Sequence, residues 1–119
     1  MLVLYRFAVA EHETEDFSRD AEAALAALAS CDGYVRGGLG RAVDEDATWL
    51  LFTEWAGVGA YRRALSNYRV KMSTPLLSRA LPEASGFEVL AECAPAGEPV
   101  GAGSDRSDDP DAARREASR

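Results

Sequence analysis

Residues 47–56, ATWLLFTEWA, carry five large apolar side chains in ten positions. In an extended strand, successive side chains point to opposite faces of the sheet. The apolar residues therefore divide into two sets: Trp49, Leu51 and Trp55 on one face, and Leu50 and Phe52 on the other. A sheet that is apolar on both faces must be covered on both. Two or three helices from a chain of 119 residues cover only one of them, so we expect the other face to pack in a homodimer.

The rest of the chain predicts three further strands and two long helices. Strands are expected at 2–9, 34–43 and 86–93, with the second strand pairing with 47–56 as a hairpin. A first helix is expected from Thr14 to about Cys31, because Phe17, Ala21, Ala24, Leu25 and Leu28 recur at helical spacing.

A second helix is expected after Gly57, with one apolar side formed by Val58, Tyr61, Leu65 and Tyr68. Thr74-Pro75 predicts the start of a short third helix. The order β-α-β-β-α-(α)-β predicts an α+β fold of the ferredoxin-like type, a four-stranded antiparallel sheet with helices on one face. We expect one domain over 1–93 and a disordered acidic tail over 94–119, a segment without aromatic residues.

Charge and cysteine content exclude several classes of partner. The net charge is −7, and neither 1–93 nor 94–119 is basic overall, so neither nucleic acid nor a membrane surface is an expected partner. No apolar run approaches the length of a membrane span, and the first residues lack the basic lead of a signal peptide. Cys31 and Cys93 stand apart in the sequence, which favours reduced thiols and a cytoplasmic location.

Two weak motifs carry no chemistry. His12 lies between Glu11 and Glu13, but adjacent residues rarely converge on one ion and the chain has no second histidine. No metal site is therefore predicted. The glycines of residues 36–41, RGGLGR, lie inside an expected strand without a following helix, so they do not predict a phosphate-binding loop.

The element order, the strand ending in TEW, the following VGAYRRALSNY and the closing PLL helix resemble the antibiotic biosynthesis monooxygenase family. The resemblance covers about residues 1–92. It implies a dimeric α/β barrel, with a pocket between the sheet and the helices of each subunit. Better-known members of this family oxidise aromatic substrates such as anthrones with O2, without metal or flavin. The resemblance therefore implies a cofactor-independent monooxygenase for a small aromatic or quinol-like molecule.

The resemblance also suggests residue roles. Trp55 matches the usual tryptophan of the family, and the helix that lines the pocket in relatives corresponds to the stretch after it. The candidate catalytic residues are Asn67, Tyr68 and Arg6, and the candidate substrate-binding residues are Trp55, Trp49, Tyr61 and Arg36. In this scheme Trp55 and Tyr68 wall the substrate, Asn67 and Tyr61 bond its oxygens, and Arg6 or Arg36 stabilises its anion.

Each candidate also has a purely structural interpretation. The tryptophans and Tyr61 suit a packed core, Asn67 suits a helix C-cap, and the strand arginines can pair with Glu54 or Glu88 across the sheet. Many family members carry a histidine nine or ten residues after the tryptophan, where this chain has Ala64-Leu65. The alternative function is therefore a non-catalytic dimeric module that binds a small molecule, with haem binding and degradation as a third.

Overall fold

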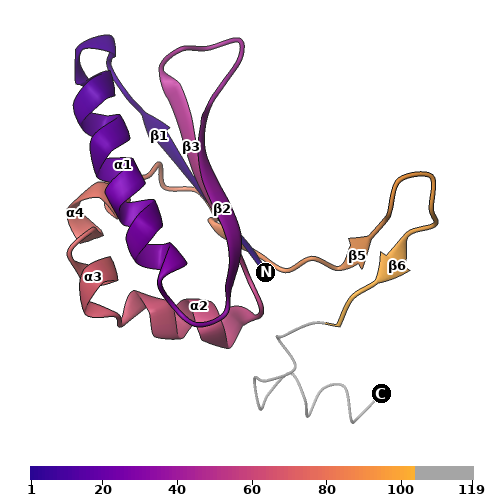
Figure 1. Ribbon diagram of the computed structural model, residues 1–119. Helices are drawn as coiled ribbons and strands as arrows, with labels where there is room; N and C mark the ends of the chain where they lie inside the picture. Colours follow the sequence, from indigo (N-terminus) through magenta and orange to yellow (C-terminus); the bar gives the residue numbers. More distant parts are fainter. Residues whose placement is uncertain (104–119) are drawn as a thin grey trace. The chain divides into compact units, whose positions relative to one another are not determined.

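The computed structural model describes residues 1–103, and the chain divides into two compact units after Phe87. The first unit contains three longer strands, two longer helices and several short elements (Figure 1). In chain order they are β1 (Leu2–Ala8), the 3-10 turn Glu11–Glu13, α1 (Thr14–Ala29), β2 (Tyr34–Arg41), β3 (Thr48–Trp55), α2 (Val58–Leu65), α3 (Tyr68–Lys71), α4 (Thr74–Leu77) and β4 (Gly86–Phe87).

The four strands form one antiparallel sheet in the order β2-β3-β1-β4. In its register Tyr5 faces Leu51 across β1 and β3, and Gly38 faces Phe52 across β2 and β3. Helix α1 and the run from α2 to α4 lie on the same side of this sheet (Figure 1). The predicted α+β ferredoxin-like fold is confirmed.

Burial in β3 alternates residue by residue, as period-two geometry requires. Trp49, Leu51 and Trp55 are buried beneath the helices, whereas Leu50 and Phe52 are half-buried on the opposite face. The predicted division of this strand is therefore correct. The half-buried residues Leu2, Leu4, Leu50 and Phe52 form what we call the open sheet face.

The second predicted helix is broken into two. Helix α2 ends at Leu65, and Asn67 adopts an extended backbone before α3 begins. The Oδ1 atom of Asn67 accepts from the backbone N–H groups of Arg69 at 2.9 Å and Val70 at 3.4 Å, so it is an N-cap rather than a C-cap. The expected stripe is therefore correct at Tyr61, which is buried together with Ala60 and Ala64, but wrong at Leu65 and Tyr68, which are exposed.

The turn between α1 and β2 depends on a glycine. Gly33 has φ +86°, and a Cβ built there would lie 2.4 Å from the Cβ of Ala60 on α2. Glycine alone tolerates both the left-handed backbone and this close approach. Gly33 therefore brings the end of α1 against α2, which places Cys31 and Asp32 near the second helix.

The strand expected at 86–93 is divided between the two units. Only Gly86–Phe87 pairs with β1, while β5 (Ala91–Glu92) pairs with β6 (Val100–Gly101) in a separate two-stranded sheet. Residues 88–90, between β4 and β5, belong to neither strand in the described structure. The tail predicted over 94–119 thus includes a strand at 100–101, and the rest of that prediction, from 104 onward, lies outside the described residues.

Candidate functional site

Three aromatic rings meet between the sheet and α2. The ring of Trp55 lies 5.7 Å from that of Tyr61 and 5.6 Å from that of Tyr34, centroid to centroid. The Tyr61 hydroxyl is hydrogen-bonded to the Tyr5 hydroxyl from β1. We call these four residues the aromatic cluster. They belong to, or pack against, one core cluster that also contains Ala64 and Val70.

Burial raises the pKa of Tyr61 well above its ordinary value, and the hydrogen bond with Tyr5 adds to this effect. Tyr61 therefore stays a neutral phenol at any physiological pH. Tyr5 is half-buried although its neighbours Val3 and Phe7 on the same face are fully buried, and it packs against both core clusters of the unit. The pair retains one hydroxyl hydrogen not used between the two oxygens, which can be donated to a ligand oxygen.

The two tryptophans lie in different surroundings. Trp55 is 2% exposed, and its indole N–H donates to Oγ1 of Thr53 at 2.8 Å. Trp49 belongs to the other core cluster, where it packs edge-on against Phe17. The buried Nε1 of Trp49 has no hydrogen-bond partner among the described residues, and the guanidinium of Arg41 lies 5.3 Å from its ring centroid. The structure thus does not bring Trp49 together with Trp55.

A cavity of about 260 Å³ lies beside the aromatic cluster. Its lining consists of Ser30, Cys31, Asp32, Arg63, Ala64 and Asn67. Ala64 and Cys31 connect the cavity to the cluster, because both also contact the core that contains Trp55 and Tyr61. The family resemblance places a histidine at position 64 or 65, where this chain has Ala64 and Leu65.

Asn67 is the predicted site residue that the structure places at this cavity. Its Oδ1 is occupied by the α3 cap, so its Nδ2 amide remains as a donor toward the cavity. Tyr68, the next residue, is 76% exposed. Its side chain does not line this cavity, so the structure separates the predicted wall residue Tyr68 from Trp55.

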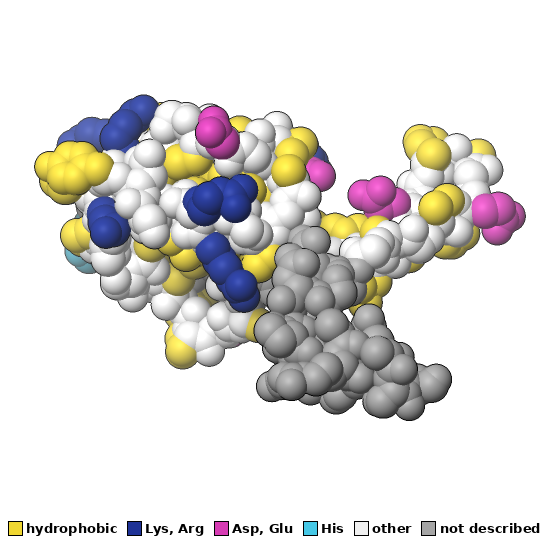
Figure 2. All heavy atoms as spheres, turned by 90° about the horizontal axis from the view of Figure 1, so that it is seen from below, with side chains coloured by type: hydrophobic (Ala, Val, Ile, Leu, Met, Phe, Trp, Pro, Cys, Tyr) yellow, Lys and Arg dark blue, Asp and Glu magenta, His cyan; other side chains and the backbone are white. Residues whose placement is uncertain are grey.

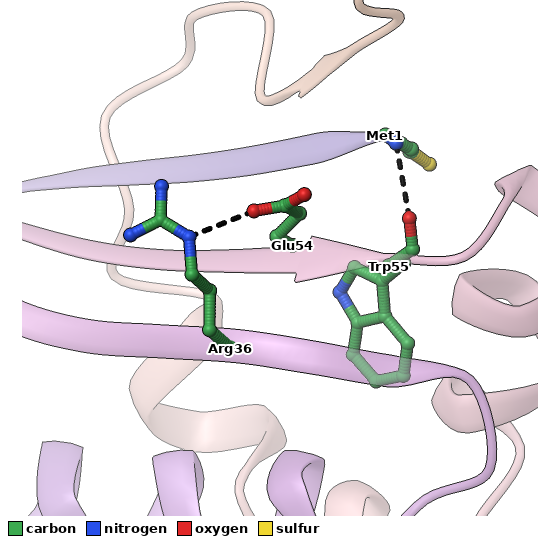
Figure 3. A network of polar contacts seen from close by, with 4 residues as sticks. All are labelled: Met1, Arg36, Glu54 and Trp55. Carbon is green, nitrogen blue, oxygen red and sulfur yellow. Dashed lines mark hydrogen bonds and ion pairs between the residues drawn. The ribbon is translucent and has the colours of Figure 1, made fainter. Parts of the chain in front are cut away.

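Arg6 and Arg36 lie on the opposite face of the sheet from Trp55 and Tyr61. Arg36 donates to Glu54 at 2.8 Å, and Figure 3 shows these two side chains pointing toward one another while the Trp55 indole turns away. Arg6 pairs with Glu83 at 3.0 Å. Both arginines are paired with carboxylates, so the structure does not bring them together with Trp55, and their role as partners of a substrate anion stays a prediction.

Sequence reasoning missed Tyr5, Asp32 and Arg63. Tyr5 sits at an inward position of the predicted first strand, so strand alternation could have found it. Asp32-Gly33 follows the first helix as a turn signal, which could have indicated a loop side chain near the pocket. The side chain of Arg63 is exposed, yet it also lines the cavity.

Among residues 1–103, no group of three or more His, Cys, Asp or Glu side chains is placed to hold a metal ion. No helix in this part of the chain is long and apolar enough to cross a membrane. Both Cys31 and Cys93 are free thiols. The predicted independence from metal and cofactor stays a prediction.

Solved structures with the same architecture exist. A mutant form of SnoaB, a cofactor-independent oxygenase from Streptomyces nogalater, matches with 27% identity and a TM-score of 0.58 over 67% of this chain and 82% of its own. A conserved protein from Methanosarcina mazei Go1 matches with 16% identity and a TM-score of 0.60, over 71% and 84% of the two chains. A protein from Nitrosomonas europaea, described as a candidate antibiotic biosynthesis monooxygenase, matches with 14% identity and a TM-score of 0.56, over 70% and 88%.

No protein-family model and no curated protein sequence matches the chain. The strand order and the helices on one face of the sheet define a ferredoxin-like α+β domain. More particularly, the structural neighbours include candidate antibiotic biosynthesis monooxygenases and the oxygenase SnoaB, which confirms the resemblance read from the sequence.

Proposed function

We propose that this chain is a cofactor-independent oxygenase that oxidises a one- or two-ring phenolic or quinol-like substrate with O2. The observation that carries the proposal is the cavity bordered by Ala64 and Asn67 beside the aromatic cluster. The likeness to SnoaB, a cofactor-independent oxygenase, supports the reaction class. The proposed assembly is a homodimer through the open sheet face, and the proposed location is the cytoplasm, where free Cys31 and Cys93 stay reduced.

The cavity volume limits the substrate. A dry cavity of about 150 Å³ holds one benzene ring, and pockets for drug-sized ligands begin near about 300 Å³. At about 260 Å³ the cavity has room for one or two rings. A naphthol or naphthoquinol therefore suits it in size.

The lining residues suit substrate-assisted chemistry. Asp32 takes the proton of an acidic phenol, and the guanidinium of Arg63 with the Nδ2 amide of Asn67 stabilises the resulting anion. The anion passes one electron to O2, the radical pair recombines to a carbon-bound peroxide anion, and this anion takes back the proton held by Asp32. Loss of water from the peroxide converts one ring C–H into C=O. The substrate supplies all four electrons that reduce O2, so each turnover consumes one O2 and releases one H2O.

Asn67 allows a test that separates catalysis from folding. Asn67→Asp keeps a side-chain oxygen for the α3 cap but lacks the amide donor, whereas Asn67→Ala loses both. We expect both variants to lose at least about tenfold in oxygen uptake with naphthoquinols, while only Asn67→Ala loses stability in urea. Catalase and 18O2 labelling of the product distinguish monooxygenation from release of hydrogen peroxide. Full activity in Asn67→Asp would assign Asn67 to the cap alone.

The second candidate is a non-catalytic binding module. It is favoured by the internal pairing of the cluster, since Trp55 donates to Thr53 and Tyr61 bonds Tyr5. Tryptophan fluorescence titrated with anthrones, naphthoquinols and haem separates the candidates, with Trp55→Phe as the control. Saturable quenching without oxygen uptake indicates the binding module. A Soret band on adding haem would favour haem chemistry, and the absence of both ligand binding and oxygen uptake would reject the oxygenase.

A further inference from the structure

The basic residues of the chain are not spread evenly. Residues 55–82 contain Arg62, Arg63, Arg69, Lys71 and Arg79 and no acidic residue, although the whole chain has 13 basic and 20 acidic residues. Residues 1–93 and 94–119 are each acidic overall, so their net charges do not reveal this basic stretch. In the structure this segment forms α2, α3 and α4, so its charges gather on neighbouring helices.

The cations of this segment are largely uncompensated. Arg79 pairs with Glu13 at 3.2 Å. Arg62, Arg63, Arg69 and Lys71 are exposed and form no ion pair with any residue in the described part of the chain. By contrast, Arg6, Arg19 and Arg36 elsewhere in the chain each pair with a carboxylate.

Large apolar side chains lie among these cations. Leu65 is 40% exposed, Tyr68 is 76% exposed and Met72 is 66% exposed. Tyr68 and Met72 are four residues apart at the two ends of α3, which places them on the same side of that turn. Figure 2 shows Lys and Arg side chains gathered with apolar ones on the face seen from below, over the helices. We call Arg62, Leu65, Tyr68, Arg69, Lys71 and Met72 the basic surface.

We propose that the basic surface docks an acidic protein partner. Tyr, Arg and Met are enriched in the cores of protein interfaces, and exposed Met adapts to the shape of a partner. Charge complementarity supplies orientation and a fast association rate. An acidic partner with apolar side chains among its carboxylates would match both components of this surface.

Two other polyanions fit less well. Nucleic acid binding typically uses about six to ten phosphate contacts, and this surface offers only Arg62, Arg69 and Lys71, together with the neighbouring Arg63. A membrane-surface helix presents a long apolar face, whereas α3 has four residues. Both a long polyanion and an extended anionic plane would also meet the acidic residues of α1, which include Glu15, Asp16, Asp20 and Glu22. A compact partner avoids them.

The test measures binding of a fluorescein-labelled helical peptide rich in Glu and Leu, by anisotropy. We expect saturable binding that weakens as salt is raised, and loss of binding when every Glu in the peptide is replaced by Gln. The double variant Arg69→Glu/Lys71→Glu and the variant Tyr68→Ser should each weaken binding about tenfold or more. The matched control Arg19→Glu, at an exposed position of α1, should change peptide binding less than about twofold.

Circular dichroism verifies that the variants fold, and all substituted side chains are exposed. Equal binding of the Gln peptide, or unchanged binding by the charge-reversed variant, would overturn the proposal. Tighter binding to phosphatidylserine vesicles or to a single-stranded oligonucleotide than to the acidic peptide would also overturn it, because the surface would then recognise a lipid or a nucleic acid.

Discussion

The Tyr5 hydroxyl on β1 is hydrogen-bonded to the Tyr61 hydroxyl on α2, which joins the middle of the sheet to the helix that follows its third strand. This contact spans 56 positions of the sequence. It fixes the inner wall of the aromatic cluster, and it keeps the one strongly shifted phenol of the described residues protonated.

Stability should fall at alkaline pH because of Tyr61. Its pKa is raised in the folded state by burial and by Tyr5, so above about pH 10 the unfolded chain releases a proton that the folded chain keeps. The free energy of unfolding then decreases by up to about 1.4 kcal/mol per pH unit from this group. Urea unfolding at about pH 8 and about pH 11, on either side of the ordinary tyrosine pKa, measures the effect. Tyr61→Phe should show a shallower decrease, and an identical slope in both proteins would contradict the assignment.

Gly33 should not tolerate a side chain. Gly33→Ala places a Cβ in the left-handed region and against Ala60, so we expect a loss of about 2–4 kcal/mol in the free energy of unfolding. Gly40→Ala is the matched control, because a Cβ there meets nothing within 4 Å. The two variants are compared by thermal and urea unfolding. Equal stability of both would show that the α1–β2 turn rearranges freely.

The two tryptophans should differ in their response to the same substitution. Trp55→Phe removes a buried indole that donates to Thr53, whereas Trp49→Phe removes an indole N–H that has no partner among the described residues. Removing the first leaves the Thr53 hydroxyl buried without that donor, and removing the second abolishes an unsatisfied buried group. We expect Trp55→Phe to cost about 1–2 kcal/mol more than Trp49→Phe. Urea unfolding at neutral pH measures both losses in the free energy of unfolding. A larger loss for Trp49→Phe would refute this account.

The open sheet face should hold a homodimer together. Phe52 is half-buried there above Gly38, where an added Cβ would lie 2.8 Å from its ring. Phe52→Glu places a charge in this apolar face, so we expect the dimer dissociation constant to rise at least about tenfold. Sedimentation velocity measures it, with Val43→Glu as the control, because Val43 is 95% exposed in the β2–β3 loop. A monomeric native protein would reject the homodimer outright.

The predictable part of the fold follows from local periodicity. The alternation of residues 48–55 predicted which side chains of β3 are buried, and the spacing of Phe17, Ala21 and Ala24 predicted the buried side of α1. The prediction of one continuous second helix was wrong, because hydrophobic periodicity takes no account of capping by a side chain. Asn67 caps a new helix there, and the shift in phase moves Tyr68 from the expected core to the surface.

The candidate site was predictable only in part. Trp55, Tyr61 and Asn67 could be chosen from the sequence because the family resemblance suggests a pocket there, and the structure places them in or beside one core cluster and its cavity. Arg6 and Arg36 could not be assigned a role in this way. A charged residue within a strand is conspicuous in any sequence, but its partner is set by the register, which pairs Arg36 with Glu54 across β2 and β3.

By itself, the sequence determined the order of strands and helices, the two-sided apolar character of β3 and the absence of acidic residues from 55–82, because these properties depend on residue type and short-range spacing. Only the tertiary structure decided that Tyr5 reaches Tyr61, that Asp32 and Arg63 share a cavity, and that the last predicted strand contributes only Gly86–Phe87 to the main sheet. These features join segments distant in sequence, and their geometry is fixed by packing and strand register, which local patterns do not encode.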